Sequence, residues 1–294
     1  IVRRYLARYA PYRTLAIEPF SMGTDTYFCE PMIGAPTNWI YLSAGAHLHH
    51  NSMDTIEKVD PRTLRHLSFI NASYLFYLAD AGFEDVSWIA NLTFGRGAEV
   101  IQAKAREMNE RVLNARDGAE LGRALAEGTE IIRYYTGLQR DAIGSIERLA
   151  DNSDAARSRE ALAPFKQSLA EIGAAAEKQL RILAENRAKS ESLAMTAPAK
   201  QETAWDREAV TLIPKRFHFA TLFLEEIPSS EWREVRSSPH WWSANNWASA
   251  SFWWVDGKRN LKEIKRLCEL EAGRPIEGFD LINYYRFLEK HKYA

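Results

Sequence analysis

The chain has 294 residues, of which 46% are hydrophobic and 26% are charged, and its formal net charge is −1 at pH 7. This length is enough for two or three domains, and the composition is typical of a soluble globular protein. The near-neutral charge provides no general attraction to nucleic acid or to an anionic membrane, and no apolar run approaches the roughly 20 residues that span a bilayer.

The first 95 residues predict the end of an α/β domain. The expected elements are a helix over 1–10, strands over 14–17 and 36–42, and a helix that starts at Asp60-Pro61 and ends near Gly82. Asp60 is suited to the N-cap and Pro61 to the first helical position. Apolar residues at three- and four-residue steps from Leu64 to Leu78 predict that this helix has one buried face.

A loop rich in histidine lies between the second expected strand and that helix. It contains His47, His49 and His50, and Asp54 follows four residues after His50. In α/β enzymes, loops just past strand ends carry metal ligands and catalytic groups. A carboxylate at Asp54 could orient the imidazole of a metal-bound histidine. The loop is therefore the candidate site.

Residues 49–55 (HHNSMDT), with Asp60-Pro61 after them, resemble a loop of the di-zinc aminopeptidases, a family that also includes glutaminyl cyclases and glutamate carboxypeptidases. Residues 23–28 (GTDTYF) are similar to a second motif of that family. The resemblance covers residues 1–82. It implies that His50 is a zinc ligand, and that Asp25 and Asp54 lie behind the ligands in the same pocket.

Within this resemblance, the other histidines have different expectations. His47 is expected to be a bystander, and His49 becomes the ligand if the register is shifted by one residue. Two residues depart from the family pattern: Thr26 stands in place of a histidine, and Asn51 in place of a threonine.

The remaining zinc ligands of the family, and its general-base Glu, have no counterpart before Asp25. The resemblance therefore implies that this chain is the C-terminal part of an aminopeptidase, in which two zinc ions activate the water that attacks a peptide substrate. A catalytic zinc needs about three protein ligands, so we expect this chain alone to be inactive. Because the chain starts at Ile1, we expect its native N-terminus to be absent, which leaves the cellular compartment open.

Residues 96–198 are rich in Ala, Glu, Arg and Leu and predict an all-α region. Apolar residues keep helical steps from Leu121 to Leu149 and again from Leu162 to Leu183, with a turn over 151–154 between the two runs. This pattern predicts two long helices paired as an antiparallel hairpin. Pro164 is expected in the first turn of the second helix or at a kink. The charged outer faces are most simply solvated, and a protein-binding face is the alternative.

Residues 199–294 are rich in aromatic side chains and predict a small α+β domain of the winged-helix type. The expected elements are a strand over 253–255 that enters a turn at Asp256-Gly257, a helix capped by Asn260 and Glu263, a helix over 281–288 and a strand over 291–293. From Asp256 onward, nine basic residues stand against seven acidic ones. DNA-binding modules have a clearer basic stripe, so we expect no nucleic-acid partner.

The two cysteines, Cys29 and Cys268, are too few for a disulfide framework and too far apart to suggest a cysteine-based zinc site. We expect Cys29 to be buried. Its neighbour Glu30 raises the pKa of a thiol rather than lowering it, so reactivity is not expected.

Two functions remain open. One is a fragment of a zinc-dependent aminopeptidase whose peptide site is completed by upstream residues. The other is a non-catalytic interaction protein that retains a degenerate peptidase remnant and binds a protein partner through its helical hairpin or its aromatic tail. Thr26 and Asn51 favour the second.

Overall fold

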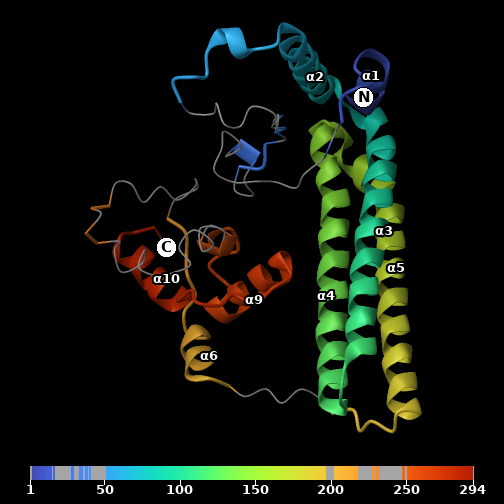
Figure 1. The fold of residues 1–294 in the computed structure, drawn as a ribbon, viewed down its shortest axis with the longest axis vertical. Helices are drawn as coiled ribbons and strands as arrows, with labels where there is room; N and C mark the ends of the chain where they lie inside the picture. Colours follow the sequence, from blue (N-terminus) through green and yellow to red (C-terminus); the bar gives the residue numbers. More distant parts are fainter. Residues whose placement is uncertain are drawn as a thin grey trace. The chain divides into compact units, whose positions relative to one another are not determined.

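The computed structural model describes residues 2–14, 16, 28–29, 33–35, 37–38, 40, 51–196, 202–217, 227–228, 230–231, 247–248 and 250–293 (Figure 1). The chain divides into two compact units. The first unit combines Ile1–Ser73 with Glu202–Ala294, and the second unit is Tyr74–Gln201. Every regular element in the described ranges is helical.

The predicted α/β domain is therefore wrong, since the described residues contain helices and no strand. Parts of both expected strands lie outside the described residues. In the second expected strand, residues 36–42, Asn38 Nδ2 donates a 3.2 Å hydrogen bond to Asn71 Oδ1, and Ile40 packs with Leu6 and Ile70. A strand is stabilised by backbone pairing with a neighbour. These residues instead contact helices through their side chains.

The first unit begins with α1 (Val2–Tyr9), which ends before Pro11 as predicted. A short 3₁₀ helix, η3 (Ile56–Lys58), precedes α2 (Pro61–Asp80). Asp60 caps α2, since its Oδ1 accepts the backbone N–H of Arg62 at 3.0 Å. The predicted Asp-Pro helix start is confirmed. Helix α2 continues from the first unit into the second.

The second unit is built on three long helices, α3 (Phe83–Asn114), α4 (Gly118–Ser145) and α5 (Ala155–Ser190), which lie side by side in Figure 1. Two 3₁₀ segments, η4 (Ile146–Leu149) and η5 (Asn152–Asp154), connect α4 to α5. Each of the three helices packs against both of the others. Helices α4 and α5 correspond to the two predicted helices and pack against each other, and α3 adds a third helix, so the region is a three-helix bundle.

The sequence did not predict α3 as a separate helix for two reasons. Glycines near residue 96 suggest a break there, and the actual break between α3 and α4, at residues 115–117, has only a weak signal. The glycines Gly95 and Gly97 lie inside α3, where Gly97 packs against Gln139 and Leu169. The true break precedes α4, whose N-cap Asp117 accepts the backbone N–H of Glu120 at 2.8 Å. A capping aspartate is a weaker signal in a sequence pattern than a Gly-x-Gly, although here it marks the start of α4.

Close helix contacts in the bundle depend on glycine. A Cβ built on Gly173 would lie 2.3 Å from Thr136 Oγ1, and one on Gly128 would lie 2.8 Å from Leu180 Cδ2. Helices α4 and α5 therefore approach closely at these positions because no side chain separates them. Pro164 lies inside α5, ten residues into the helix, rather than in its first turn.

The C-terminal part of the first unit contains α6 (Ala204–Ala209), α9 (Leu261–Ala272) and α10 (Leu281–Lys290). Asn260 and Glu263 form the predicted capping box of α9, and Gly273 ends this helix at a φ of 66°. The left-handed conformation at that position favours glycine. The helices enclose an aromatic and aliphatic core that includes Trp247, Phe252, Val255, Leu261, Ile264, Tyr284, Tyr285 and Leu288.

The winged-helix prediction is wrong for this region. Residues 250–253 are helical, so the expected strand at Trp253 is not formed. The Asp-Gly turn is present, because Asp256 Oδ1 accepts the backbone N–H groups of Lys258 and Arg259. The expected last strand is a turn, and among the described residues a backbone hydrogen bond of 3.2 Å joins Phe217 N–H to the carbonyl of Tyr293. One such bond does not make a sheet.

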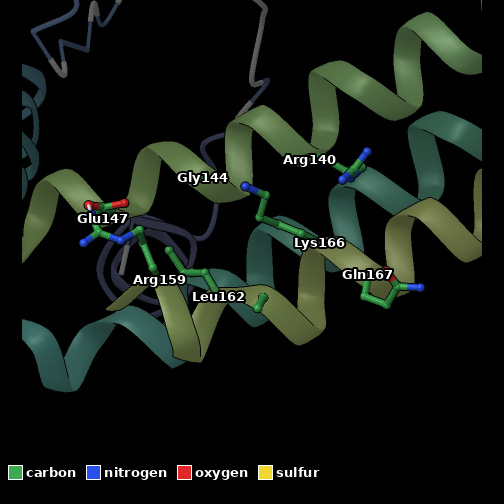
Figure 2. A pocket seen from close by; sticks show the side chains of 8 residues that line it. Arg140, Gly144, Glu147, Arg159, Leu162, Lys166 and Gln167 are labelled. Carbon is green, nitrogen blue, oxygen red and sulfur yellow. Dashed lines mark hydrogen bonds and ion pairs between the residues drawn. The ribbon is translucent and has the colours of Figure 1, made fainter. Parts of the chain in front are cut away.

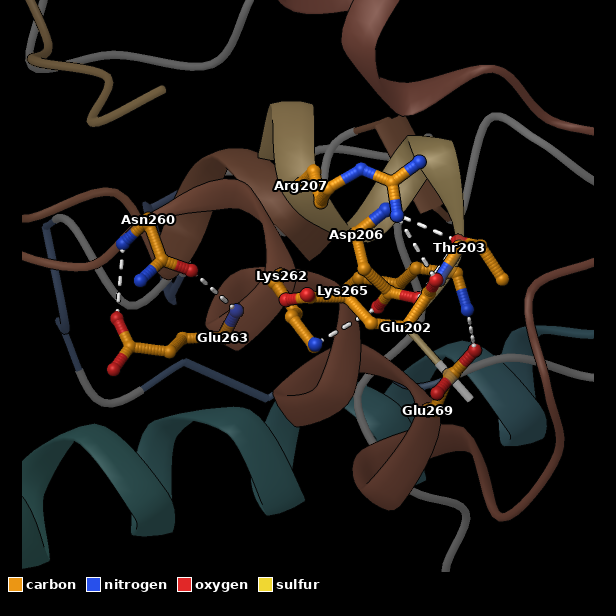
Figure 3. Close-up of polar contacts among 9 residues, drawn as sticks. All are labelled: Glu202, Thr203, Asp206, Arg207, Asn260, Lys262, Glu263, Lys265 and Glu269. Atoms are coloured by element: carbon orange, nitrogen blue, oxygen red, sulfur yellow. Dashed lines mark hydrogen bonds and ion pairs between the residues drawn. The ribbon is translucent and has the colours of Figure 1, made fainter. Parts of the chain in front are cut away.

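A network of polar contacts fixes α6 to α9 (Figure 3). Thr203 and Asp206 cap α6 reciprocally, and the ammonium of Lys262 on α9 lies 3.0 Å from Asp206 Oδ1. Within α9, Lys265 pairs with Glu269, which also accepts the backbone N–H of Ile276 at 3.1 Å. Across the described ranges, no helix combines the length and apolar character that a membrane span requires.

Candidate functional site

The described part of the predicted zinc loop is a tight turn that starts at Asn51. The side-chain oxygen of Asn51 accepts the backbone N–H of Met53 at 2.8 Å, and its carbonyl accepts that of Asp54 at 3.1 Å. Asparagine commonly forms turns in this way. The Asp54 side chain is exposed. The predicted ligand His50, the bystanders His47 and His49, and Asp25 lie outside the described residues.

The turn leads through η3 to the start of α2, which is held by several contacts. Besides capping the helix, Asp60 accepts the Thr63 hydroxyl at 3.2 Å and lies 3.9 Å from the guanidinium of Arg13. Hydrogen bonds from the backbone and side chain of Arg62 hold the pKa of the Asp60 carboxyl below its usual range. Arg13 also donates to Thr63. The start of α2 is therefore tied to the segment that follows α1.

A second set of contacts joins α1 to α2. The hydroxyl of Tyr5 lies 2.8 Å from Nδ1 of the buried His66, and the Tyr5 ring stacks on Phe69 at 4.4 Å between centroids. Leu6 and Ile70 are buried beside this pair. Helices α1 and α2 are thus packed together within the first unit.

The described residues do not supply a metal site by themselves. They contain no group of three or more His, Cys, Asp or Glu side chains arranged to hold a metal ion. Asp54 alone offers one carboxylate, whereas a zinc site requires about three or four protein ligands. A zinc site at this loop would therefore need ligands beyond the described ranges.

Helix α2 exposes more apolar surface than the sequence pattern predicts. Leu64 and Leu75 were expected to be buried, but 53% and 62% of their surfaces are exposed, and Phe69 and Phe76 are also exposed. The buried face instead consists of His66 and Ile70. Exposed apolar residues of this size on one helix are typical of a surface that another segment or partner covers.

The two cysteines differ in burial. Cys268 is buried in the aromatic core, and burial raises the pKa of its thiol well above the usual range. Cys29 is half-buried rather than buried as predicted. Thiolate is the nucleophilic and metal-binding form, so Cys268 is a packing residue.

The C-terminal region has an apolar groove that sequence reasoning did not identify. It has a volume of about 860 Å³ and is lined in part by Leu212, Ile213, Pro214 and Phe217. Ile213 and Phe217 are exposed within the described residues. Cationic side chains, including Lys215, also line it. The only signal in the sequence was a run of apolar residues around Pro214, which does not distinguish a groove from a core.

Comparisons with models of known protein families, with curated proteins and with solved structures find no match to this chain.

Proposed function

We propose that this chain is the C-terminal part of a zinc-dependent aminopeptidase, with His50 as a zinc ligand and Asp25 and Asp54 behind the ligands. The zinc would activate the water that attacks the substrate. The observation that carries the proposal is the sequence of residues 49–61, from the histidine pair through Asp54 to the capped Asp60-Pro61 helix start. The resemblance to the di-zinc aminopeptidases rests on this spacing.

Two structural features support the proposal. The turn at Asn51 and the cap at Asp60 are held by the hydrogen bonds described above, so the loop enters α2 in a defined way. The exposed apolar residues of α2 suit a helix that packs against the rest of a larger domain. The remaining zinc ligands would come from that domain.

The test uses the full-length natural protein that contains this sequence. We expect His50→Ala to lose most of the aminopeptidase activity and to lower the zinc content, because removing a ligand empties or distorts a metal position. His47→Ala is the matched control, since it removes a histidine of the same loop, and it should retain both properties. If His49→Ala loses activity and zinc while His50→Ala keeps both, the zinc ligand is His49 and not His50.

The chain alone provides a second test. Without the other ligands, we expect it to bind Zn²⁺ weakly in calorimetry. A sub-micromolar zinc site that is lost in His50→Ala would contradict the view that the ligand set is completed elsewhere.

The second candidate is an interaction protein with a degenerate peptidase remnant. The apolar groove with exposed Ile213 and Phe217 favours it, since exposed apolar grooves are common protein-binding sites. If none of the three histidine variants changes activity or zinc content, this candidate replaces the enzyme.

A further inference from the structure

A pocket with a positive charge lies between α4, η4 and α5 of the bundle (Figure 2). Its volume is about 320 Å³, and the residues that determine its chemistry are Arg140, Glu147, Arg159 and Lys166. All of them lie within residues 51–196, which the structure describes without a gap. The pocket shares no lining residue with the groove of the C-terminal region.

The charges that line this pocket are not balanced. Glu147 is the only carboxylate among the lining residues, and it is paired with Arg159. Neither Arg140 nor Lys166 forms a hydrogen bond or ion pair with any residue in the described ranges. The lining Gln167 donates its amide to Glu171 at 2.9 Å, outside the pocket. Two positive charges therefore remain without a partner.

The pocket has room for a ligand because two of its lining residues, Gly144 and Ala163, are small. Gly144 has no side chain, and a Cβ built there would lie 3.5 Å from Nζ of Lys166. Figure 2 shows Lys166 reaching from α5 toward Gly144 on α4, with Arg140 one turn earlier on α4. Lys166 is half-buried and the lining Leu162 is buried. A partly buried ammonium without a partner is unfavourable unless an anion supplies one.

We propose that this pocket binds a phosphate group, either as inorganic phosphate or as a small phosphate monoester. A phosphate carries a charge of about −1.5 to −2 near neutral pH and offers several acceptor oxygens, which matches two unpaired cations better than a single carboxylate does. Arg140 supplies the planar donor pair suited to phosphate oxygens, and Lys166 supplies a point charge. Arg159 is held near the pocket by Glu147.

A structural role for Lys166 is the competing explanation. Helix α4 ends at Ser145, and a cation near a helix C-terminus is stabilised by the carbonyl groups there. In that case Lys166 would be neutralised locally and the pocket would show no preference for phosphate. This explanation leaves Arg140 without a role, and it makes a different prediction for ligand binding.

The test uses the full chain, titrated in a calorimeter with inorganic phosphate and, separately, with phosphoserine, at constant ionic strength set with chloride. We expect saturable binding to one site. The double variant Arg140→Gln/Lys166→Gln should weaken it at least roughly 10-fold, as expected for the loss of two charge-assisted contacts. Ala163→Glu, which adds a carboxylate at an exposed position in the lining, should weaken it without removing a cation.

Matched controls separate the pocket from the general charge of the bundle. Lys178→Gln/Arg181→Gln removes the same charge from exposed positions of α5, and Ala174→Glu adds a carboxylate at another exposed position of α5. Both controls should bind as the parent chain does. Far-ultraviolet circular dichroism checks that every variant keeps its helices.

Two outcomes would overturn the proposal: no saturable binding of either ligand, or equal weakening of binding by the pocket variants and by the controls. If binding is saturable and lost in the pocket variants alone, the proposal stands. The ligand with the lower dissociation constant then tells whether free phosphate or a monoester is the better occupant.

Discussion

The hydroxyl of Tyr5 lies 2.8 Å from Nδ1 of His66, and this contact joins α1 to α2 across 61 positions of sequence. The Tyr5 ring also stacks on Phe69, so α1 is attached by both a polar and an aromatic contact. The candidate histidine loop lies between these two residues in the chain.

The first prediction concerns this contact. Tyr5→Phe keeps the ring but removes the hydroxyl, which leaves the buried His66 nitrogen without its partner. We expect the free energy of unfolding to fall by about 1 kcal/mol, and by up to ~3 kcal/mol if the nitrogen finds no other hydrogen-bond partner. Amide hydrogen exchange should become faster in α1. Tyr12→Phe is the control, because that side chain is exposed, and it should change little. Equal effects of the two variants would contradict this role.

The second prediction compares two helical glycines of the bundle. Gly173→Ala would place a Cβ 2.3 Å from Thr136 Oγ1, and we expect it to destabilise the chain by about 1–3 kcal/mol through overpacking. Gly137→Ala has open space around its Cβ and should stabilise by about 0.5–1 kcal/mol, since alanine favours a helix. Urea unfolding measures both. Changes of the same sign would show that α4 and α5 are not in close contact at Gly173.

The third prediction concerns the end of α3. The guanidinium of Arg187 on α5 donates to the carbonyl of Val112, and its Nη2 lies 2.5 Å from the carbonyl of Ala115. Arg187→Met keeps much of the side-chain volume but leaves these carbonyls without their hydrogen-bond donor. We therefore expect the free energy of unfolding to fall by about 1–3 kcal/mol. Urea unfolding of the chain is the measurement. Arg181→Met, at an exposed position, should cost much less.

The fourth prediction is a dependence of stability on acid pH at Asp206. Hydrogen bonds from Thr203 and the ion pair with Lys262 hold the pKa of Asp206 well below its ordinary value of 3.8. A carboxyl whose pKa is lowered by folding stabilises the folded state above the unfolded pKa, and this contribution is lost as pH falls through the folded pKa. Asp206→Asn should therefore be less stable than the parent chain near pH 6, and the difference should narrow progressively as pH falls below about 3.8 toward the lower pKa of the folded state.

Thermal unfolding from pH 6 to pH 2 measures this gap, and Asp141→Asn, which removes an exposed carboxyl of α4, is the control. A gap between Asp206→Asn and the parent chain that is independent of pH would mean that the carboxylate charge at Asp206 does not matter.

Much of the helical structure could be predicted from local signals. The Asp60-Pro61 start of α2, the Asn260 and Glu263 box of α9 and the glycine that ends α9 act over four residues or fewer, so the sequence displays them directly. The fold class was wrong because short apolar runs do not distinguish a strand from a helix or from a segment packed against helices. Ile40, expected in a strand, packs with α1 and α2.

The candidate site could be predicted only in part. The motif of residues 49–61 identifies the histidine loop and the start of α2, and the structure describes the loop from Asn51 onward. The phosphate pocket had no sequence signal, because Arg140 and Lys166 look like ordinary surface cations of amphipathic helices. Their lack of partners becomes visible only when α4 and α5 are packed together.

The sequence by itself determined several helix boundaries, including the start of α2 and both ends of α9, since caps, prolines and apolar spacing act within one or two turns. The tertiary structure decided what those helices contact: Tyr5 with His66, Gly173 with Thr136, and Arg187 with the carbonyl end of α3. These pairs join residues tens of positions apart. Their formation depends on the shape and packing of whole helices, which no local pattern contains.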